Sequence, residues 1–167
     1  MKNSDKILIA IVAGVVLLVA VAFIVALTRP DPAYQAENTP EGVAHNYLLA
    51  LQQEDYERAY GYLSPDIRHY PRNLDRFITD IQNYGYNFSQ DQDSVTLEIV
   101  SSRLDGNRAT IEVKQTTFYQ GDLFNSGEWS HTFTMNLKRN SAGGAWKIYA
   151  SDSYWVYCWT DAYSTCK

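Results

Sequence analysis

The chain has 167 residues, which is enough for one ordinary domain and a short accessory segment. Its 46% hydrophobic and 14% aromatic residues are typical of a chain that builds a packed core, and they exclude a disordered one. From Pro30 onward, 11 Lys and Arg stand against 18 Asp and Glu, a net charge of -7. Such a body repels nucleic acid, and the sequence shows no basic stripe interleaved with aromatic residues, so no nucleic-acid partner is expected.

Residues 7–27 form an apolar run, "ILIAIVAGVVLLVAVAFIVAL". A helix needs about 20 apolar residues to cross the core of a bilayer. We therefore predict a transmembrane helix at 7–27 that holds the protein in the cell membrane. A cleaved signal peptide is the alternative, because Ala20-Val21-Ala22 has the small-x-small pattern of a cleavage site. The apolar run continues beyond the length of a signal core, which favours the uncleaved helix.

The cations beside this run predict its orientation. Lys2 and Lys6 precede it, whereas Arg29 is the only cation that follows closely. The positive-inside rule then makes residues 1–6 a cytoplasmic tail and puts the rest of this single-pass protein outside the membrane. Residues 28–38, rich in proline and polar side chains, are predicted to be a stiff spacer between membrane and domain.

The domain is predicted to occupy residues 39–157 and to begin with about three helices. Thr39-Pro40-Glu41 is a helix start, with a capping residue, a proline in the first turn and an acid. A short helix follows "QED" and stops at Ser64-Pro65, and a third is expected at about 73–84. Its apolar stripe aligns Phe77 with Tyr84.

From Val95 onward the pattern alternates between apolar and polar residues, which indicates strands. Two strands join at "LDGNR", a third runs about 131–138, and a fourth begins at Trp146 and continues to Tyr157. Each strand has a single apolar side, as in an antiparallel sheet covered on one face. The prediction is an α+β fold, with the helices packed on a curved four-stranded antiparallel sheet.

The segment "AHNYLLALQQEDYERAYGYLSPDI" resembles the opening of NTF2-like (cystatin-like cone) domains. It is similar to membrane-anchored bacterial versions, including the NTF2-like domain that precedes the catalytic part of some penicillin-binding proteins, and to stand-alone extracytoplasmic members. The resemblance covers about residues 38–157. It implies a cone with a pocket between sheet and helices. In this superfamily the pocket binds small apolar molecules, performs acid-base isomerisation or dehydration, or is simply a packed core.

Enzymes of this superfamily place an Asp, His or Tyr inside the cone, and two residues are candidates here. His131 shares a strand face with Phe133. Asp80 borders the apolar stripe of the third helix, where it could face a pocket mouth or pair with Arg76. Both have structural interpretations, a core or strand-end histidine and a solvated or paired aspartate.

The sequence lacks the motifs of other kinds of catalytic site. The sequence has no H-x-x-x-H or C-x-x-C spacing, so no metal site is expected. G-x-S-x-G does not occur, and the S-x-x-K spacing of transpeptidases occurs only as Ser164-Thr165-Cys166-Lys167, without the S-D-N and K-T-G motifs that accompany it in such enzymes. No glycine-rich phosphate cradle suggests a cofactor. Asn87-Phe88-Ser89 fits a glycosylation acceptor, which matters only in a glycosylating host.

Aromatic residues are the second kind of candidate, because Tyr and Trp are common at binding surfaces and 13 Tyr and 4 Trp are present. The alternative is that most of them fill the core. The pocket or surface candidates are Tyr47, Phe77, Tyr84, Phe133, Trp155, Trp159 and Tyr163.

The last ten residues, 158–167, contain both cysteines of the chain, Cys158 and Cys166. Outside the membrane a disulfide persists, so we predict a bond between them that closes a short loop. Trp159 and Tyr163 would be presented on this loop, and Trp155 would end the last strand.

The function expected from the sequence is non-catalytic. It is the binding of a partner protein, a cell-wall component or a small ligand in the cell envelope, with a homodimer through the sheet as a further option. The alternative is a small cone enzyme, an isomerase or dehydratase that uses His131 or Asp80.

Overall fold

The computed structural model describes residues 3–27, 32–84, 88, 94–119 and 127–160. The chain divides into two compact units, Met1–Ala33 and Tyr34–Lys167. The first contains helix α1 (Asn3–Leu27), and the second is the α+β domain.

Helix α1 confirms the apolar helix that the sequence predicts. Its Lys6–Ile24 span is long and apolar enough to cross a membrane, and none of its residues is buried. A signal sequence near the N-terminus has the same two properties. Membrane anchoring and orientation therefore stay predictions.

Helix α2 (Pro40–Gln52) begins where the sequence predicts it. The Thr39 side chain accepts a hydrogen bond from the Gly42 N–H at 3.1 Å, and proline occupies the first turn. Val43 and Tyr47 are buried on the face that meets the sheet, at 1% and 0% exposure.

The segment just before α2 packs against the helix instead of standing away from it. The side chain of Asn46 accepts from the Gln35 N–H at 2.7 Å and donates to the Gln35 carbonyl at 2.9 Å. Gly42 permits this approach, because a Cβ there would lie 2.0 Å from the Ala36 carbonyl oxygen. The compact domain thus begins at Tyr34, inside the range predicted as a spacer.

Two further helices complete the helical part. Helix α3 (Tyr56–Gly61) is capped by Asp55, whose Oδ1 accepts from the Arg58 N–H at 3.2 Å. Helix α4 (Leu74–Tyr84) matches the predicted third helix. Between them, Leu63 forms a parallel bridge with Ile148, so this segment lies beside the outer edge of the sheet.

The sheet is an antiparallel meander in the order β1-β2-β3-β4. Its strands are β1 (Val95–Asp105), β2 (Arg108–Tyr119), β3 (Gly127–Lys138) and β4 (Lys147–Ser151). The predicted turn between β1 and β2 contains Gly106 at φ 58, a conformation that glycine adopts without strain. The register of β1 shifts between Ile99 and Ser101, and the residue between them, Val100, is 46% exposed.

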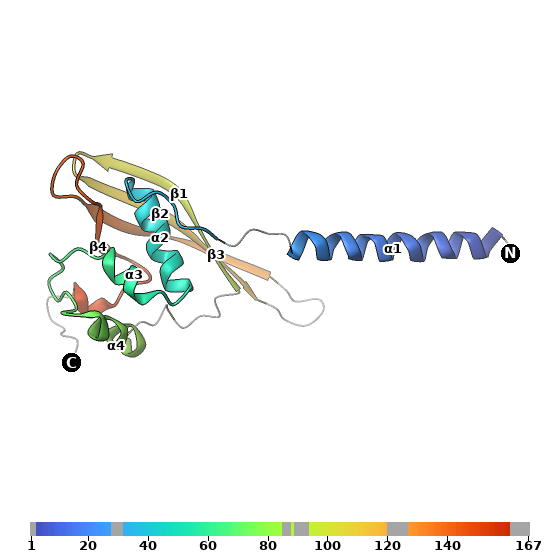
Figure 1. The fold of residues 1–167 in the computed structure, drawn as a ribbon, viewed down its shortest axis with the longest axis horizontal. Coiled ribbons are helices and arrows are strands. Elements are labelled where there is room, and N and C mark those ends of the chain that lie inside the picture. The colour runs from blue at the N-terminus through green and yellow to red at the C-terminus, as the bar shows by residue number, and fades with distance from the viewer. Residues whose placement is uncertain (1–2, 28–31, 85–87, 89–93, 120–126, 161–167) are drawn as a thin grey trace. The chain divides into compact units, whose positions relative to one another are not determined.

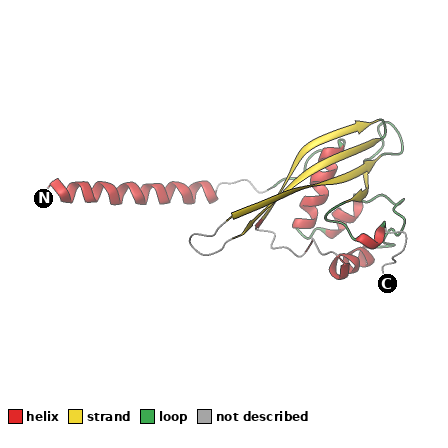
Figure 2. Ribbon diagram, turned by 180° about the vertical axis from the view of Figure 1, so that it is seen from behind, coloured by secondary structure: helices red, strands yellow, loops and turns green. Residues whose placement is uncertain are grey.

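Helices α2, α3 and α4 lie on one side of the sheet, as Figures 1 and 2 show. From Ala109 to Gln115 on β2 and from Phe133 to Leu137 on β3, buried residues alternate with exposed or half-buried ones, which confirms a sheet covered on a single face. The domain is therefore α+β, with one core between sheet and helices. Its largest fully buried side chains include Trp159, Tyr47, Phe77, Ile111, Met135, Leu137 and Ile148.

The end of the domain differs from the prediction. Strand β4 stops at Ser151 and does not continue to Tyr157. The chain turns at Tyr154, which has a φ of 53, and then enters a short 3-10 helix, η3 (Tyr157–Trp159). The carbonyl of Tyr154 accepts a hydrogen bond from the buried Tyr47 hydroxyl at 2.8 Å, which ties this turn to α2. Alternation in the sequence could not reveal this tertiary contact.

Candidate functional site

His131 lies on the covered face of β3, at the edge of the core. Phe133 is 5% exposed, His131 is half-buried, and Trp129 beyond it is 58% exposed. The imidazole stacks on the Trp129 ring with centroids 4.6 Å apart. Its Nδ1 is buried, and within the part of the chain that the structure describes no hydrogen bond or ion pair joins His131 to another ionisable group. A general base with an orienting partner is therefore not assembled there by the described residues.

Asp80 is enclosed on α4 and does not point to solvent. Its side chain is 1% exposed and its Oδ1 is 2.8 Å from Nε of Arg76, one turn earlier. The indole Nε1 of Trp159 donates to Oδ2 at 2.9 Å. A buried carboxylate is destabilising unless it is paired and hydrogen-bonded, and these two contacts provide both. The predicted pairing with Arg76 is confirmed, and the solvated alternative is wrong.

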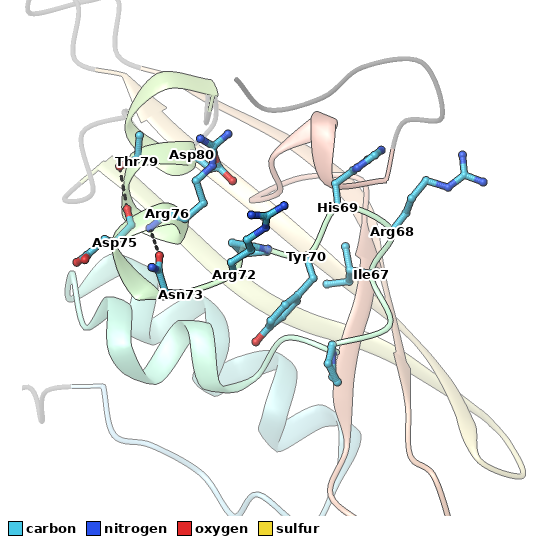
Figure 3. Close-up of a pocket in the computed structure, with 12 residues that line it drawn as sticks. Ile67, Arg68, His69, Tyr70, Arg72, Asn73, Asp75, Arg76, Thr79 and Asp80 are labelled. Atoms are coloured by element: carbon cyan, nitrogen blue, oxygen red, sulfur yellow. Dashed lines mark hydrogen bonds and ion pairs between the residues drawn. The ribbon is translucent and has the colours of Figure 1, made fainter.

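A cavity of about 850 Å³ lies beside this ion pair, between α4 and the segment that leads into it. Figure 3 shows the side chains that line it, which come from residues 65–73 and from one face of α4. Its ionisable lining residues are Arg68, His69, Arg72, Asp75, Arg76 and Asp80. We refer to it as the arginine cavity.

Local structure positions these residues. The His69 N–H donates to the Trp159 carbonyl at 3.0 Å, which joins the loop to η3. The Tyr60 hydroxyl donates to the Pro71 carbonyl at 2.8 Å, and its ring stacks on Tyr70 at 5.4 Å. Asn73 then starts α4, since its Oδ1 accepts from the Arg76 N–H at 2.9 Å. The loop is thus held at both ends.

Sequence reasoning did not identify the arginine cavity. Its signal was available, because "RHYPRNLDR" places Arg68, His69, Arg72 and Arg76 within one short stretch of an otherwise acidic domain. Grouping them required knowing that the chain folds back before α4, which the helix pattern does not show.

Several predicted aromatic candidates fill the core. Tyr47 and Phe77 are both 0% exposed, and Phe133 is 5% exposed. Trp146, 2% exposed, lies with them in the same cluster. These side chains pack the space between sheet and helices.

Trp159 is buried, although the sequence places it on an exposed loop. It is 0% exposed, and its ring stacks on Phe77 at 5.5 Å. The exposed-loop prediction is wrong because the indole both fills the core and donates to Asp80. Trp155 packs edge-on against Trp159 at 5.0 Å and is half-buried.

The remaining candidates are less enclosed or not described. Tyr84 is half-buried and packs edge-on against Tyr157 at 6.0 Å. Tyr163, Cys166 and the possible acceptor Asn87 lie outside the described residues. The Cys158–Cys166 disulfide therefore stays a prediction; Cys158 itself is 1% exposed. Among the described residues, no group of three or more His, Cys, Asp or Glu could hold a metal ion.

Burial raises the pKa of several tyrosines, and for three of them the shift is large. It raises the pKa of Tyr154 to about 12. It also raises the pKa of Tyr47, deep in the core, and that of Tyr70, where the hydrogen bond with Tyr60 adds to the effect. All three phenols are therefore neutral at physiological pH, and none is prepared to act as a base there.

Comparison with known proteins gives no family assignment. No protein-family profile matches the chain, and no curated protein matches it. Among solved structures, a SEC-C motif protein from Rhodopseudomonas palustris is 17% identical, with a TM-score of 0.47, over 71% of this chain and 81% of that one. A protein described as a calcium/calmodulin-dependent protein kinase type II association domain, from Thiobacillus denitrificans, is 11% identical, with a TM-score of 0.45, over 70% and 94%. At these values the similarities carry no functional argument.

Proposed function

We propose that this protein is a membrane-anchored, extracytoplasmic NTF2-like domain that binds a partner or a small ligand in the cell envelope and performs no catalysis. The apolar α1 supports the anchor. The order of elements, helices followed by a four-stranded meander, supports the NTF2-like assignment together with the sequence resemblance.

The observation that carries the non-catalytic part is the filled interior. Where a cone enzyme would need an open pocket, Tyr47, Phe77 and Phe133 are packed together with Met135 and Trp146. The only polar contact of the Tyr47 hydroxyl that the structure describes is to the Tyr154 carbonyl. A packed interior leaves ligand binding to the outside of the domain.

Two outer surfaces of the domain suit binding. One is the arginine cavity. The other is the end of the β2–β3 pair, where Phe118, Tyr119 and Trp129 are 45%, 53% and 58% exposed. Exposed Tyr and Trp side chains are frequent energetic centres of protein interfaces.

Site-specific photocrosslinking in the native membrane tests this proposal. A photoreactive amino acid would replace Thr79 in the arginine cavity, Trp129 at the strand end or, as a control, the exposed Glu98 on β1. We expect a discrete adduct from Thr79 or Trp129 and none from Glu98. Equal labelling at all three positions, or no adduct at any, would contradict specific binding.

Protease added to right-side-out membrane vesicles tests the orientation. The domain should be digested while a tag fused before Met1 survives. Survival of the domain and loss of the tag would reverse the proposed topology.

The cone-enzyme alternative retains one observation in its favour, the buried and unpartnered Nδ1 of His131 among the described residues. Asp80 does not support it, because both its oxygens are engaged by Arg76 and Trp159. If His131→Gln left crosslinking unchanged and abolished a measurable turnover, the enzyme reading would replace ours.

A further inference from the structure

The arginine cavity contains a guanidinium that buried residues hold in place. Arg76 is itself 32% exposed, but its partner Asp80 is 1% exposed and the indole behind Asp80 belongs to Trp159, at 0%. Since Asp80 engages the Nε edge of Arg76, the two terminal nitrogens of the guanidinium remain as donors. A side chain fixed in this way loses little conformational entropy when it binds a ligand.

A second arginine lines the same cavity. Figure 3 shows Arg72 and Arg76 extending into the space between α4 and residues 67–69, whereas Arg68 points outward. Among the described residues, no carboxylate forms an ion pair with Arg72. Asp75 lines the cavity but points away from Arg72. Arg76 is neutralised by Asp80, so the local excess of positive charge comes from Arg72.

We propose that the arginine cavity binds an oxyanion, a carboxylate or phosphate group carried by a small organic molecule, through Arg72 and Arg76. This inference rests on the proposed binding function and names its ligand class. Guanidinium groups bind both oxyanions with paired hydrogen bonds. The volume of about 850 Å³ lies within the usual range for small-molecule sites, about 300–1,000 Å³.

The rest of the lining suits the organic part of such a ligand. Ile67, Tyr70 and the prolines at 65 and 71 provide apolar surface beside the guanidinium groups. An apolar wall with few convergent polar groups is the usual composition of a ligand site.

Trp159 provides a spectroscopic reporter for this proposal. Its indole N–H donates to Asp80, which holds Arg76, so anion binding at Arg76 should change the NMR resonance of that N–H. The full-length protein in a non-ionic detergent would be titrated separately with inorganic phosphate and succinate, with sodium chloride at matched ionic strength as control. We expect a saturable shift for Trp159 and no such shift for the exposed Trp129 indole.

Three substitutions distinguish anion binding at this site from a general effect of the protein's charge. Arg72→Gln and Arg76→Lys should each weaken the binding of the better probe at least about tenfold, since each removes charge-assisted hydrogen bonds. Arg103→Gln removes one charge from an exposed position on β1 and should leave binding unchanged. Arg76→Lys keeps a cation beside buried Asp80, so the fold should be retained. Arg72→Gln should also leave the fold intact, because Arg72 is at the surface.

The outcomes separate this inference from the proposed function. No saturable shift with either probe, or equal weakening by Arg103→Gln, would overturn the oxyanion site. If crosslinking at Trp129 persisted in that case, partner binding would stand without it. Preference for phosphate over succinate, or the reverse, would identify which oxyanion the site takes.

Discussion

At the scale of single residues, Tyr47 and Tyr154 join the first helix of the domain to its last turn. The Tyr47 hydroxyl reaches the Tyr154 carbonyl across 107 positions of sequence, and both side chains are buried. Burial favours the neutral phenol and raises the pKa of Tyr154 to about 12, from an ordinary value of 10.0. Because the pKa of Tyr154 is raised in the folded state, the stability of the fold depends on pH in the alkaline range.

We predict that the domain loses stability as pH rises above about 10. A folded-state pKa above the unfolded value means that the folded protein holds its proton longer, so the contribution is complete below pH 10 and is lost towards pH 12. Urea unfolding followed by circular dichroism between pH 8 and 11 should show this fall. It should be shallower in Tyr154→Phe, while Tyr119→Phe, at an exposed position, should behave as the parent. Identical slopes in all three proteins would contradict the assignment.

At the scale of elements, the sequence predicted the helices and the strand turn well, but it did not predict the irregular segment that follows β4. Helices α2 and α4 and the β1–β2 turn were predictable because Thr39, the apolar stripe around Phe77 and the glycine in "LDGNR" are local signals. The turn at Tyr154 and the burial of Trp159 depend on partners far away in sequence. The arginine cavity was missed for the same reason, since it needs the loop, α4 and η3 together.

The segment after β4 contains both cysteines of the chain. If Cys158 and Cys166 form the predicted disulfide, reduction should lower the free energy of unfolding by about 2–3 kcal/mol, because a short closed loop restricts the unfolded chain. Denaturant unfolding with and without reductant measures this difference, and Cys166→Ser should remove it. An equal thiol titre before and after reduction would show that the bond does not form.

At the scale of the whole molecule, the core belongs entirely to one unit. Its buried residues run from Val43 to Trp159, and the compact domain begins at Tyr34. α1 contributes an apolar surface and no core residue. Folding and membrane attachment are therefore expected to be separable.

We predict that removing residues 1–33 releases a folded domain from membranes. Its melting temperature should match that of the full chain in detergent, because no core side chain is lost. Fractionation and thermal unfolding provide the two measurements. If expression of the full chain instead gave a soluble protein that begins at Phe23, the apolar segment would be a cleaved signal sequence. An unfolded truncated domain would contradict the division into two units.

The position of Trp159 also determines when the domain can fold during synthesis. Its indole is 0% exposed, stacks on Phe77 and reaches Asp80, 79 positions earlier. Until residue 159 of a nascent chain has been synthesised, the Asp80 carboxylate has Arg76 but not Trp159 as a partner, and the core is open at one end. We therefore expect such a chain to stay unfolded until almost all of the domain has been synthesised.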